Sequence, residues 1–296
     1  MGNNYSSKHF PWPIRIQDPL TGDEIIFAPH RLNRPREKDG HCPFCKQSNY
    51  PILIENKFPS LMSDIPDDVI SKGAKGFCGV IIYNQSHVTQ LEDLKIDNII
   101  TVNNLLFDTL EDYLESFPYA IAFENRGNYF GSSLSHPHGQ FWTFSWVPSN
   151  QKQYWNFFER SYVSKLKSQL INLKIQEKNY FSIYYYPYPK LPIELIVIPK
   201  QFGRLKRDHI KELSEIQVFL RALVRKYYGF NPKNSLMGWH FPPNGNYDNY
   251  LFHLTLHIPH ETETRTKIFG GIEYLTRTFI NAFPPEKLAK ILHDLV

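Results

Sequence analysis

The order of the expected strands and helices repeats along the chain, and this repeat constrains the fold more than any other feature. Each copy has a short apolar strand, a helix with one apolar face, a second strand, and finally a strand that carries histidines. The first copy runs over residues 77–147 and the second over residues 193–258, with corresponding positions about 115–117 residues apart. We therefore expect an α+β fold of two weakly similar halves, residues 1–148 and 149–296. The two halves are expected to share a mixed, mainly antiparallel sheet flanked by helices.

Short segments rich in β-branched and aromatic residues, each closed by turn residues, predict the strands. They are Glu24–Phe27, Ile52–Glu55, Phe77–Tyr83, Tyr119–Phe123, Gln140–Val147, Tyr180–Tyr186, Ile193–Ile198, Leu236–His240 and Leu251–Ile258. Apolar residues at helical spacing predict helices over Ile96–Leu114 and Asp208–Tyr227, and a third helix is expected over Tyr154–Leu173.

The composition excludes several classes of protein. The 296 residues carry 33 basic and 29 acidic side chains, and the net charge of +4 is too small to indicate a nucleic-acid partner. No apolar run approaches the ~18 residues that a membrane-spanning helix needs, so no membrane partner is expected. The first residues lack the apolar stretch of a signal peptide, and the odd count of three cysteines argues against a disulfide scaffold. We expect a cytoplasmic protein with reduced cysteines.

The segment Gly131–Trp142 contains the pattern His-Pro-His-Gly-Gln after a run of small residues. Residues two apart in an extended strand face the same side, so His136, His138 and Gln140 are expected to project together. The small residues before them let backbone amides and hydroxyls approach an anion closely. This arrangement favours attack on a phosphate group. A buried polar ladder and a pair of metal-binding histidines are the alternatives.

Cys42-Pro-Phe-Cys45 places two thiolates on one turn, a spacing that suits tetrahedral zinc. Because the chain has no second CxxC, two more ligands must come from elsewhere. His87 follows the end of an expected strand, and His136 is available as the fourth ligand. Cys78 lies within an apolar strand and is expected in the core. A redox CxxC and two unrelated thiols are the alternatives.

Several segments carry a resemblance to a known family, in order over roughly residues 12–290. They are Asp18-Pro-Leu-Thr-Gly22, Ala28-Pro-His-Arg-Leu-Asn-Arg-Pro35, Cys42-Pro-Phe-Cys45, Glu55-Asn-Lys-Phe58, Phe123-Glu-Asn125, Ser135-His-Pro-His-Gly-Gln140, Gly238-Trp-His240 and Lys267–Glu273. His-Pro-His-x-Gln with an upstream CxxC is a highly specific combination. The chain resembles the galactose-1-phosphate uridylyltransferase-type enzymes of the histidine-triad superfamily. This resemblance implies that the two halves are degenerate histidine-triad-like repeats.

The resemblance implies nucleotidyl transfer through a covalent enzyme intermediate. His138 matches the family nucleophile, which attacks the α-phosphorus of a nucleotide sugar, and Gln140 matches the residue whose amide holds the phosphate oxygens. Imidazole suits this role because it is largely neutral at pH 7 and nucleophilic. The other matched positions are Arg31, Arg34 and Ser133 near the phosphates, Asn56, Phe58 and Asn125 near the nucleoside and its phosphate, and Lys267 and Glu273 at the sugar.

The resemblance also implies a cofactor and a partner. Cys42, Cys45, His87 and His136 match the family's four zinc ligands, and such a closed site is structural. The zinc would hold the strand that carries the nucleophile. Family members are commonly homodimers in which the partner's C-terminal segment completes the site. A homodimer is therefore expected, with residues 267–273 acting across the interface.

The second half departs from the family pattern. His240 and His257 match two of the four ligands of a second metal site found in some members, but Asn150 and Thr255 occupy the positions of the other two. His253 is a possible substitute ligand without special geometry, so no second metal is expected. In the repeat, His253-Leu-Thr-Leu-His257 is read against residues 136–140, which puts Thr255 at the position of the nucleophile. The second half is therefore not expected to catalyse.

Two further departures concern the substrate. Lys57 stands where the family usually has an acidic residue beside the nucleoside, and Phe279 stands where a glutamine helps to read the sugar ring. The expected function is ping-pong transfer of a nucleoside monophosphate, UMP by resemblance, between a nucleotide sugar and a hexose 1-phosphate. The alternative is a phosphorylase that splits an ADP-sugar or a dinucleoside polyphosphate through the same intermediate. A non-catalytic protein that binds zinc and nucleotides is the third interpretation.

Overall fold

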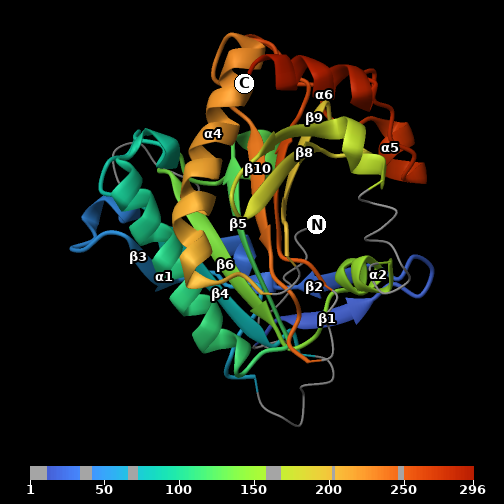
Figure 1. Cartoon of the computed structure of the whole chain (residues 1–296). Helices are drawn as coiled ribbons and strands as arrows, with labels where there is room; N and C mark the ends of the chain where they lie inside the picture. Colours follow the sequence, from blue (N-terminus) through green and yellow to red (C-terminus); the bar gives the residue numbers. More distant parts are fainter. Residues whose placement is uncertain (1–11, 34–41, 66–72, 158–167, 202–203, 246–249) are drawn as a thin grey trace.

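A computed structural model describes residues 12–33, 42–65, 73–157, 168–201, 204–245 and 250–296 (Figure 1). A nine-stranded sheet forms its centre, with the strand order β3-β4-β6-β5-β10-β11-β9-β8-β7. Every pairing between neighbouring strands is antiparallel. The bounds are β3 Ile52–Glu55, β4 Gly76–Ile82, β5 Tyr119–Arg126, β6 His138–Phe144, β7 Lys174–Glu177, β8 Phe181–Tyr185, β9 Ile193–Pro199, β10 Ser235–His240 and β11 His253–Ile258. A separate antiparallel pair is formed by β1 Ile14–Gln17 and β2 Glu24–Phe27.

The two halves of the chain meet in the middle of this sheet. Strand β5 of the first half pairs with β10 of the second half, from Ser235 opposite Arg126 to His240 opposite Ile121. The main hydrophobic core also combines side chains from both halves, such as Phe141 and Leu254. The expectation that strands of one half pair with strands of the other is therefore confirmed.

Two long helices cover one face of the sheet, α1 (Ile96–Leu114) and α4 (Ile210–Tyr228) (Figure 1). Each has apolar residues at spacings of three and four, and these residues are buried against the sheet. Burial of one such leucine or isoleucine contributes on the order of 2 kcal/mol to folding. Between the helices, the Asn103 amide donates a hydrogen bond of 2.8 Å to the Ser214 hydroxyl. The side chains of β6 alternate, so Phe141 faces the helices while His138 and Gln140 face the opposite side.

The shorter helices surround this framework. They are α2 (Ser149–Phe157), α5 (Gly271–Thr276) and α6 (Pro285–Asp294), with the 3₁₀ helices η1 (Pro29–Asn33), η2 (Pro43–Lys46), η4 (Leu91–Asp93), η5 (Asn128–Phe130), η7 (Ile171–Leu173) and η8 (Arg207–His209). In the part of the chain that the structure describes, no helix combines the length and the apolar character required to cross a membrane.

Most expected elements are present, and a few differ. Helix α1 and strands β2 and β3 have the predicted bounds. The helix expected over Tyr154–Leu173 is described only at its ends, as α2 and η7, because residues 158–167 lie outside the described residues. Strands β1 and β7 and helices α5 and α6 were not anticipated. The division of the chain at residue 148 stays a prediction.

The structure corrects the alignment of the two repeats. His138 is the first residue of β6 and His253 is the first residue of β11, and each ring donates from Nδ1 to the backbone carbonyl two residues earlier, at 2.8 and 3.0 Å. His253 therefore occupies the position that corresponds to the nucleophile, and the assignment of Thr255 to that position was wrong. The start of the strand decides the register, and the sequence spacing of the histidines does not show it.

Candidate active site and metal centre

Four predicted ligands come together in one cluster. Cys42 and Cys45 bracket the start of η2, His87 follows β4, and His136 precedes β6. Their ligand atoms all lie within 4.8 Å of one another, and the Cys45 sulfur lies 3.6 Å from His87 Nδ1 and 3.4 Å from His136 Nδ1. Zinc bond lengths at a tetrahedral angle require a sulfur-to-nitrogen separation of about 3.6 Å. The four side chains therefore fit a tetrahedral metal ion.

The ring of His136 is oriented by the backbone. Its Nε2 lies 3.0 Å from the carbonyl oxygen of Asn84, which can only accept a hydrogen bond, so Nε2 carries the proton. The lone pair then resides on Nδ1, which faces the cluster. This is the outer hydrogen bond that metal-binding histidines usually make. Among the described residues, no other group of three or more His, Cys, Asp or Glu side chains converges in this way.

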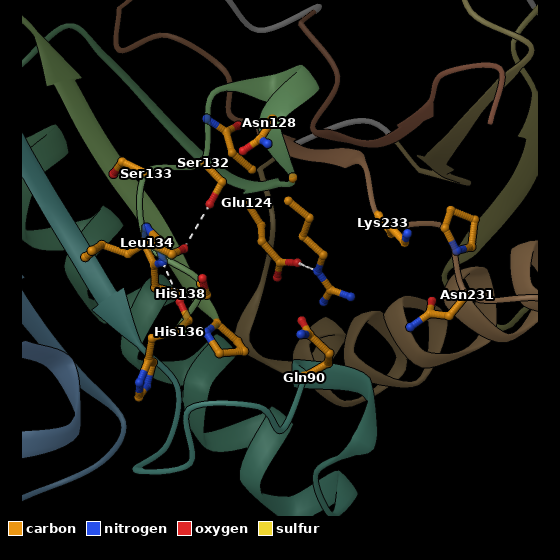
Figure 2. Close-up of a pocket in the computed structure, with 16 residues that line it drawn as sticks. Gln90, Glu124, Asn128, Ser132, Ser133, Leu134, His136, His138, Asn231 and Lys233 are labelled. Carbon is orange, nitrogen blue, oxygen red and sulfur yellow. Dashed lines mark hydrogen bonds and ion pairs between the residues drawn. The ribbon is translucent and has the colours of Figure 1, made fainter. Parts of the chain in front are cut away.

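His138 lies at the edge of a polar cleft of about 380 Å³ (Figure 2). The residue is only 8% exposed, and its Nδ1 donates to the carbonyl oxygen of His136 at 2.8 Å. Because the carbonyl oxygen can only accept a hydrogen bond, the proton of the neutral ring is on Nδ1, and Nε2 carries the lone pair. Burial, this hydrogen bond and the adjacent cleft are what a fixed nucleophile requires.

Phe44 connects the cysteine turn to both histidines. It is the residue between the two cysteines that becomes buried, and its ring meets His136 and His138 edge-on, with centroid distances of 5.8 and 5.2 Å. The orientation of the His138 ring therefore depends on the turn that the cluster anchors. Sequence reasoning missed this contact, although a large apolar side chain between two ligands was a usable signal.

The structure changes one expectation about the His-Pro-His motif. Strand β6 begins at His138, so His136 lies before the strand and its ring turns into the metal cluster. His138 and Gln140 remain on one side of β6, and Gln140 accepts a hydrogen bond of 3.2 Å from the Trp142 indole. The strand alternation that predicted a common direction therefore applies only to His138 and Gln140, because His136 precedes Pro137 outside the strand.

The cleft is built from segments that are far apart in the sequence (Figure 2). Its walls are the end of β5, the loop Ser132–Pro137 that leads to His138, Gln90, and the loop Asn231–Lys233. Asn125 and Ser133, both predicted to bind substrate, line it. Gln90 and the Asn231–Lys233 loop were not predicted, because only the folded chain brings them to the motif.

A buried ion network lies beneath this cleft. Glu124 is 2% exposed and accepts hydrogen bonds from Arg126 and from Arg221, the latter at 3.1 Å. Arg126 also pairs with both oxygens of Glu92, at 2.8 and 2.7 Å. Burial opposes the charge on Glu92, but the hydrogen bonds from Arg126 hold its pKa at about 2. A glutamate within the apolar strand β5 was the sequence signal for this network.

Three predicted substrate residues form a small unit beside β3. The Arg31 guanidinium donates to the carbonyl oxygen of Phe58 at 2.6 Å, and the Asn56 side chain accepts from the Phe58 amide at 2.9 Å. The Asn56 amide donates to the carbonyl of Cys78 on β4, the strand next to β6. None of the three lines the cleft of His138. Arg34 lies outside the described residues.

Lys267 and Glu273, predicted at the sugar, line a different and smaller cavity of about 50 Å³. The Glu273 carboxylate accepts a hydrogen bond of 3.0 Å from the Gly270 amide. Phe279 packs against Phe269 with ring centroids 5.2 Å apart. Tyr129 lines this cavity and follows Asn128 of the cleft, so the two spaces adjoin along the chain. Within the described part of one chain, Lys267 and Glu273 do not join the cleft of His138.

The second-half histidines form a stacked pair. The rings of His240 and His253 are 4.4 Å apart and nearly parallel, and His240 Nε2 lies 3.1 Å from the Thr255 hydroxyl. His257 lies apart from them, with Nδ1 3.6 Å from a Glu194 oxygen. Burial lowers the pKa of His240 well below its usual value and lowers that of His253 to about 4. In the described part of the chain, these three histidines belong to no group of three or more ligand side chains within metal-binding distance of one another.

The pKa of His253 predicts a pH dependence of stability. Its folded value of about 4 lies below the unfolded value near 6.5, so the unfolded chain binds more protons between these values and stability falls as the pH drops through this window. From pH 7 to pH 5 we expect wild type to lose about 2 kcal/mol more unfolding free energy than His253→Gln. Urea unfolding of both proteins at the two pH values measures this difference. An equal loss in both would contradict the prediction.

Comparisons with known proteins show what this chain is similar to. The family profile of the N-terminal domain of galactose-1-phosphate uridyl transferase matches residues 43–148. The galactose-1-phosphate uridylyltransferase of Thermotoga maritima is 25% identical, with 94% of this chain and 96% of the relative covered. The ADP-glucose phosphorylase of Arabidopsis thaliana is also 25% identical, with 96% and 93% covered.

Solved structures show the same fold. A uridylyltransferase structure matches with a TM-score of 0.83 at 21% identity, over 96% of this chain and 98% of that chain. The Arabidopsis thaliana ADP-glucose phosphorylase with bound ADP-glucose matches with a TM-score of 0.73, over 95% and 98%. The fold is thus that of the uridylyltransferase class. The resemblance to the galactose-1-phosphate uridylyltransferase-type family that the motifs suggested is supported by the profile match and by relatives that are similar over nearly the whole chain.

Proposed function

We propose that this protein is a nucleotidyltransferase that moves a nucleoside monophosphate between a nucleotide sugar and a hexose 1-phosphate through an intermediate on His138. The observation that carries the proposal is the ring of His138, which donates from Nδ1 to the His136 carbonyl and borders a polar cleft. In the first step Nε2 attacks the α-phosphorus, the bond to the bridging oxygen breaks, and a sugar 1-phosphate leaves. In the second step a phosphate oxygen of the acceptor attacks the same phosphorus, the phosphorus–nitrogen bond breaks, and its electron pair returns to Nε2 of the histidine.

The groups around His138 suit an anionic substrate. The Asn125 amide and the Ser133 hydroxyl line the cleft, and we assign them to the transferred phosphate. Gln140 lies two residues after His138 on the same side of β6, and we assign its amide to the phosphate oxygens of the intermediate. We assign Arg31 and Arg34 to the phosphate charge, and Asn56 and Phe58 to the nucleoside, from the family pattern.

We assign zinc to the Cys42, Cys45, His87 and His136 cluster, since two thiolates and two imidazoles at tetrahedral spacing are its preferred donor set. When bound, the metal would supply a fixed anchor for the cysteine turn and the start of β6, and we do not expect it to contact substrate. We expect the protein in the cytoplasm. All three cysteines are among the described residues and none is in a disulfide, which suits a reducing compartment.

A phosphorylase is the second candidate, in which inorganic phosphate takes the nucleotide from the same intermediate. Phe279 in place of a sugar-reading glutamine and Lys57 in place of an acidic residue favour it over strict use of UDP-hexoses. The Arabidopsis thaliana relative named for this activity has the same identity to this chain, 25%, as the uridylyltransferase from Thermotoga maritima.

Intact-protein mass spectrometry after exposure to UDP-glucose, UDP-galactose and ADP-glucose tests the proposal. The mass added names the nucleotide, UMP or AMP. The labelled protein is then given either galactose 1-phosphate or inorganic phosphate, and the acceptor that removes the label distinguishes a transferase from a phosphorylase. A chain that takes no label from any of the three nucleotide sugars would be the non-catalytic binder, and the proposal would fail.

We propose a homodimer in which Lys267 and Glu273 of one protomer reach the cleft of the other. The segment that carries them has an unusually apolar surface, in which Tyr274 and Leu275 are 84% and 82% exposed. The other exposed apolar residues of this segment are Ile268, Phe269, Ile272 and Ile280. Large contiguous apolar patches are typical of protein interfaces. In this arrangement residues 1–148 carry the reacting groups and residues 149–296 supply the sugar contacts.

Mixing two inactive variants tests the shared site. His138→Ala and Lys267→Ala are each expected to lose activity as homodimers. After subunit exchange, a mixed dimer has one cleft with both residues, so about a quarter of the wild-type activity returns at equal amounts. Recovery is measured by steady-state turnover after mild denaturation and joint refolding. No recovery from a mixture shown to contain mixed dimers would place the two residues in the same protomer.

A further inference from the structure

The hydroxyl of Tyr83 occupies the space where a side chain at position 139 would be. Tyr83 follows strand β4, and Gly139 lies between His138 and Gln140 on β6. A Cβ atom built on Gly139 would lie 2.7 Å from the Tyr83 hydroxyl oxygen, closer than real Cβ contacts come. The nearest ring carbons of Tyr83 would be 3.3 and 3.4 Å away. The backbone between the two proposed phosphate-handling residues therefore rests directly on this hydroxyl.

The hydroxyl is itself held in a fixed position. Tyr83 is 5% exposed and donates a hydrogen bond of 2.8 Å to the buried carboxylate of Glu124. Glu124 is in turn bound by Arg126 and Arg221, which come from β5 and α4. Burial and the nearby Glu124 charge raise the pKa of Tyr83, so its hydroxyl keeps the proton that it donates. The buried ion network of Arg126, Arg221 and Glu124 thus holds the Tyr83 hydroxyl, which in turn lies against Gly139.

We infer that Tyr83, held by Glu124, is a positioning residue for nucleotidyl transfer. Its hydroxyl sets the place of Gly139 and with it the placement of the His138 imidazole and the Gln140 amide about the transferred phosphate. Transfer rates are sensitive to such placement, because small misalignments of a nucleophile are costly. Tyr83 acts through the backbone and does not contact substrate. This inference rests on the proposed function.

The first test removes the hydroxyl alone. Tyr83→Phe is expected to slow the single-turnover labelling of His138 by about tenfold, while the Kd for the nucleotide sugar changes less than about twofold. Tyr185→Phe is the matched control, since Tyr185 is fully buried and donates a hydrogen bond of 2.6 Å to the Pro192 carbonyl in the other half of the sheet. Both variants should lose melting temperature, but Tyr185→Phe should label at the wild-type rate. Equal labelling rates in Tyr83→Phe and wild type would overturn the inference.

The second test measures coupling between the two positions. Gly139→Ala puts a methyl group against the hydroxyl, and we expect labelling to fall by at least about 100-fold. Adding Tyr83→Phe removes the atom at 2.7 Å and leaves only the ring contacts at 3.3 and 3.4 Å. The double variant should therefore label about tenfold faster than Gly139→Ala, although Tyr83→Phe alone is slower than wild type. A merely structural tyrosine would make the double variant slower than either single variant.

The outcomes separate the inference from the function on which it rests. Bound metal near one ion per chain shows that the start of β6 is intact in each variant. A wild-type protein that takes no nucleotide label overturns the proposed function and the inference with it. A labelled wild type with no coupling between positions 83 and 139 overturns the inference alone.

Discussion

Replacement of His138 by alanine is expected to abolish the covalent nucleotide label and to lower turnover by at least about 10⁴-fold. The reason is that the proposal assigns the phosphorus–nitrogen bond to His138, while the other histidine of the cleft, His136, directs its Nδ1 into the metal cluster. The metal content should stay near one ion per chain, because His138 is not part of the Cys/His cluster. Intact mass spectrometry with labelled nucleotide sugar and elemental analysis of the same sample measure both quantities.

His253→Ala is the matched control for this experiment. His253 is also buried, is also the first residue of its strand, and also donates from Nδ1 to the carbonyl two residues earlier. It lies in the second half, next to His240, and does not line the cleft. The control should destabilise the protein and still take the full label. A label retained by His138→Ala would mean that the nucleophile has been assigned wrongly.

The second large effect concerns the metal. Cys45→Ser removes the sulfur that lies 3.6 Å from His87 Nδ1 and 3.4 Å from His136 Nδ1. We expect bound zinc to fall to a small fraction of one ion per chain and the unfolding free energy to fall by at least about 3 kcal/mol. Labelling of His138 should also slow, because Phe44 on the same turn contacts its ring. Elemental analysis, thermal unfolding and labelling kinetics measure the three effects.

Cys78→Ser serves as the comparison. Cys78 is fully buried in β4, and burial raises the pKa of its thiol to about 11, so it remains protonated and unsuited to metal binding. This variant should lose stability through a polar group in the core but keep its metal. If Cys45→Ser retained one zinc ion per chain at an unchanged melting temperature, the structural zinc would be ruled out.

The sequence predicts long periodic elements well and short edge elements poorly. Helix α1 was predicted to the residue because its apolar residues recur at helical spacing and face one core. Strands β1 and β7 have four residues each, and such short segments have too few side chains to define a period. Helix α6 was missed although Pro285 lies in its first turn and Leu288 and Leu292 are buried one turn apart, so its signal was present and unused.

Some residues of the candidate site can be predicted from local sequence motifs, and others join it only through contacts between distant parts of the chain. The four residues of the Cys/His cluster and the proposed nucleophile, His138, could be located because short motifs fix their neighbours along the chain. Glu124 and Tyr83 belong to the site through pairing of β4, β5 and β6, which no local pattern encodes. The sequence also placed His136 on the same strand as His138, but β6 begins at His138, after Pro137. The His136 ring lies near the Asn84 carbonyl, and the His138 ring donates to the His136 carbonyl.

The pairing of β5 with β10 has a consequence for the first half of the chain, because it covers an edge of the sheet. Alone, residues 1–148 would present β5 as an uncovered edge, next to the strand β6 that carries His138. An uncovered strand edge can pair with a strand of another molecule. A fragment of residues 1–148 would therefore be expected to form fibres or domain-swapped dimers. The second half of the chain therefore protects the first half from such association, because β10 covers the edge of β5.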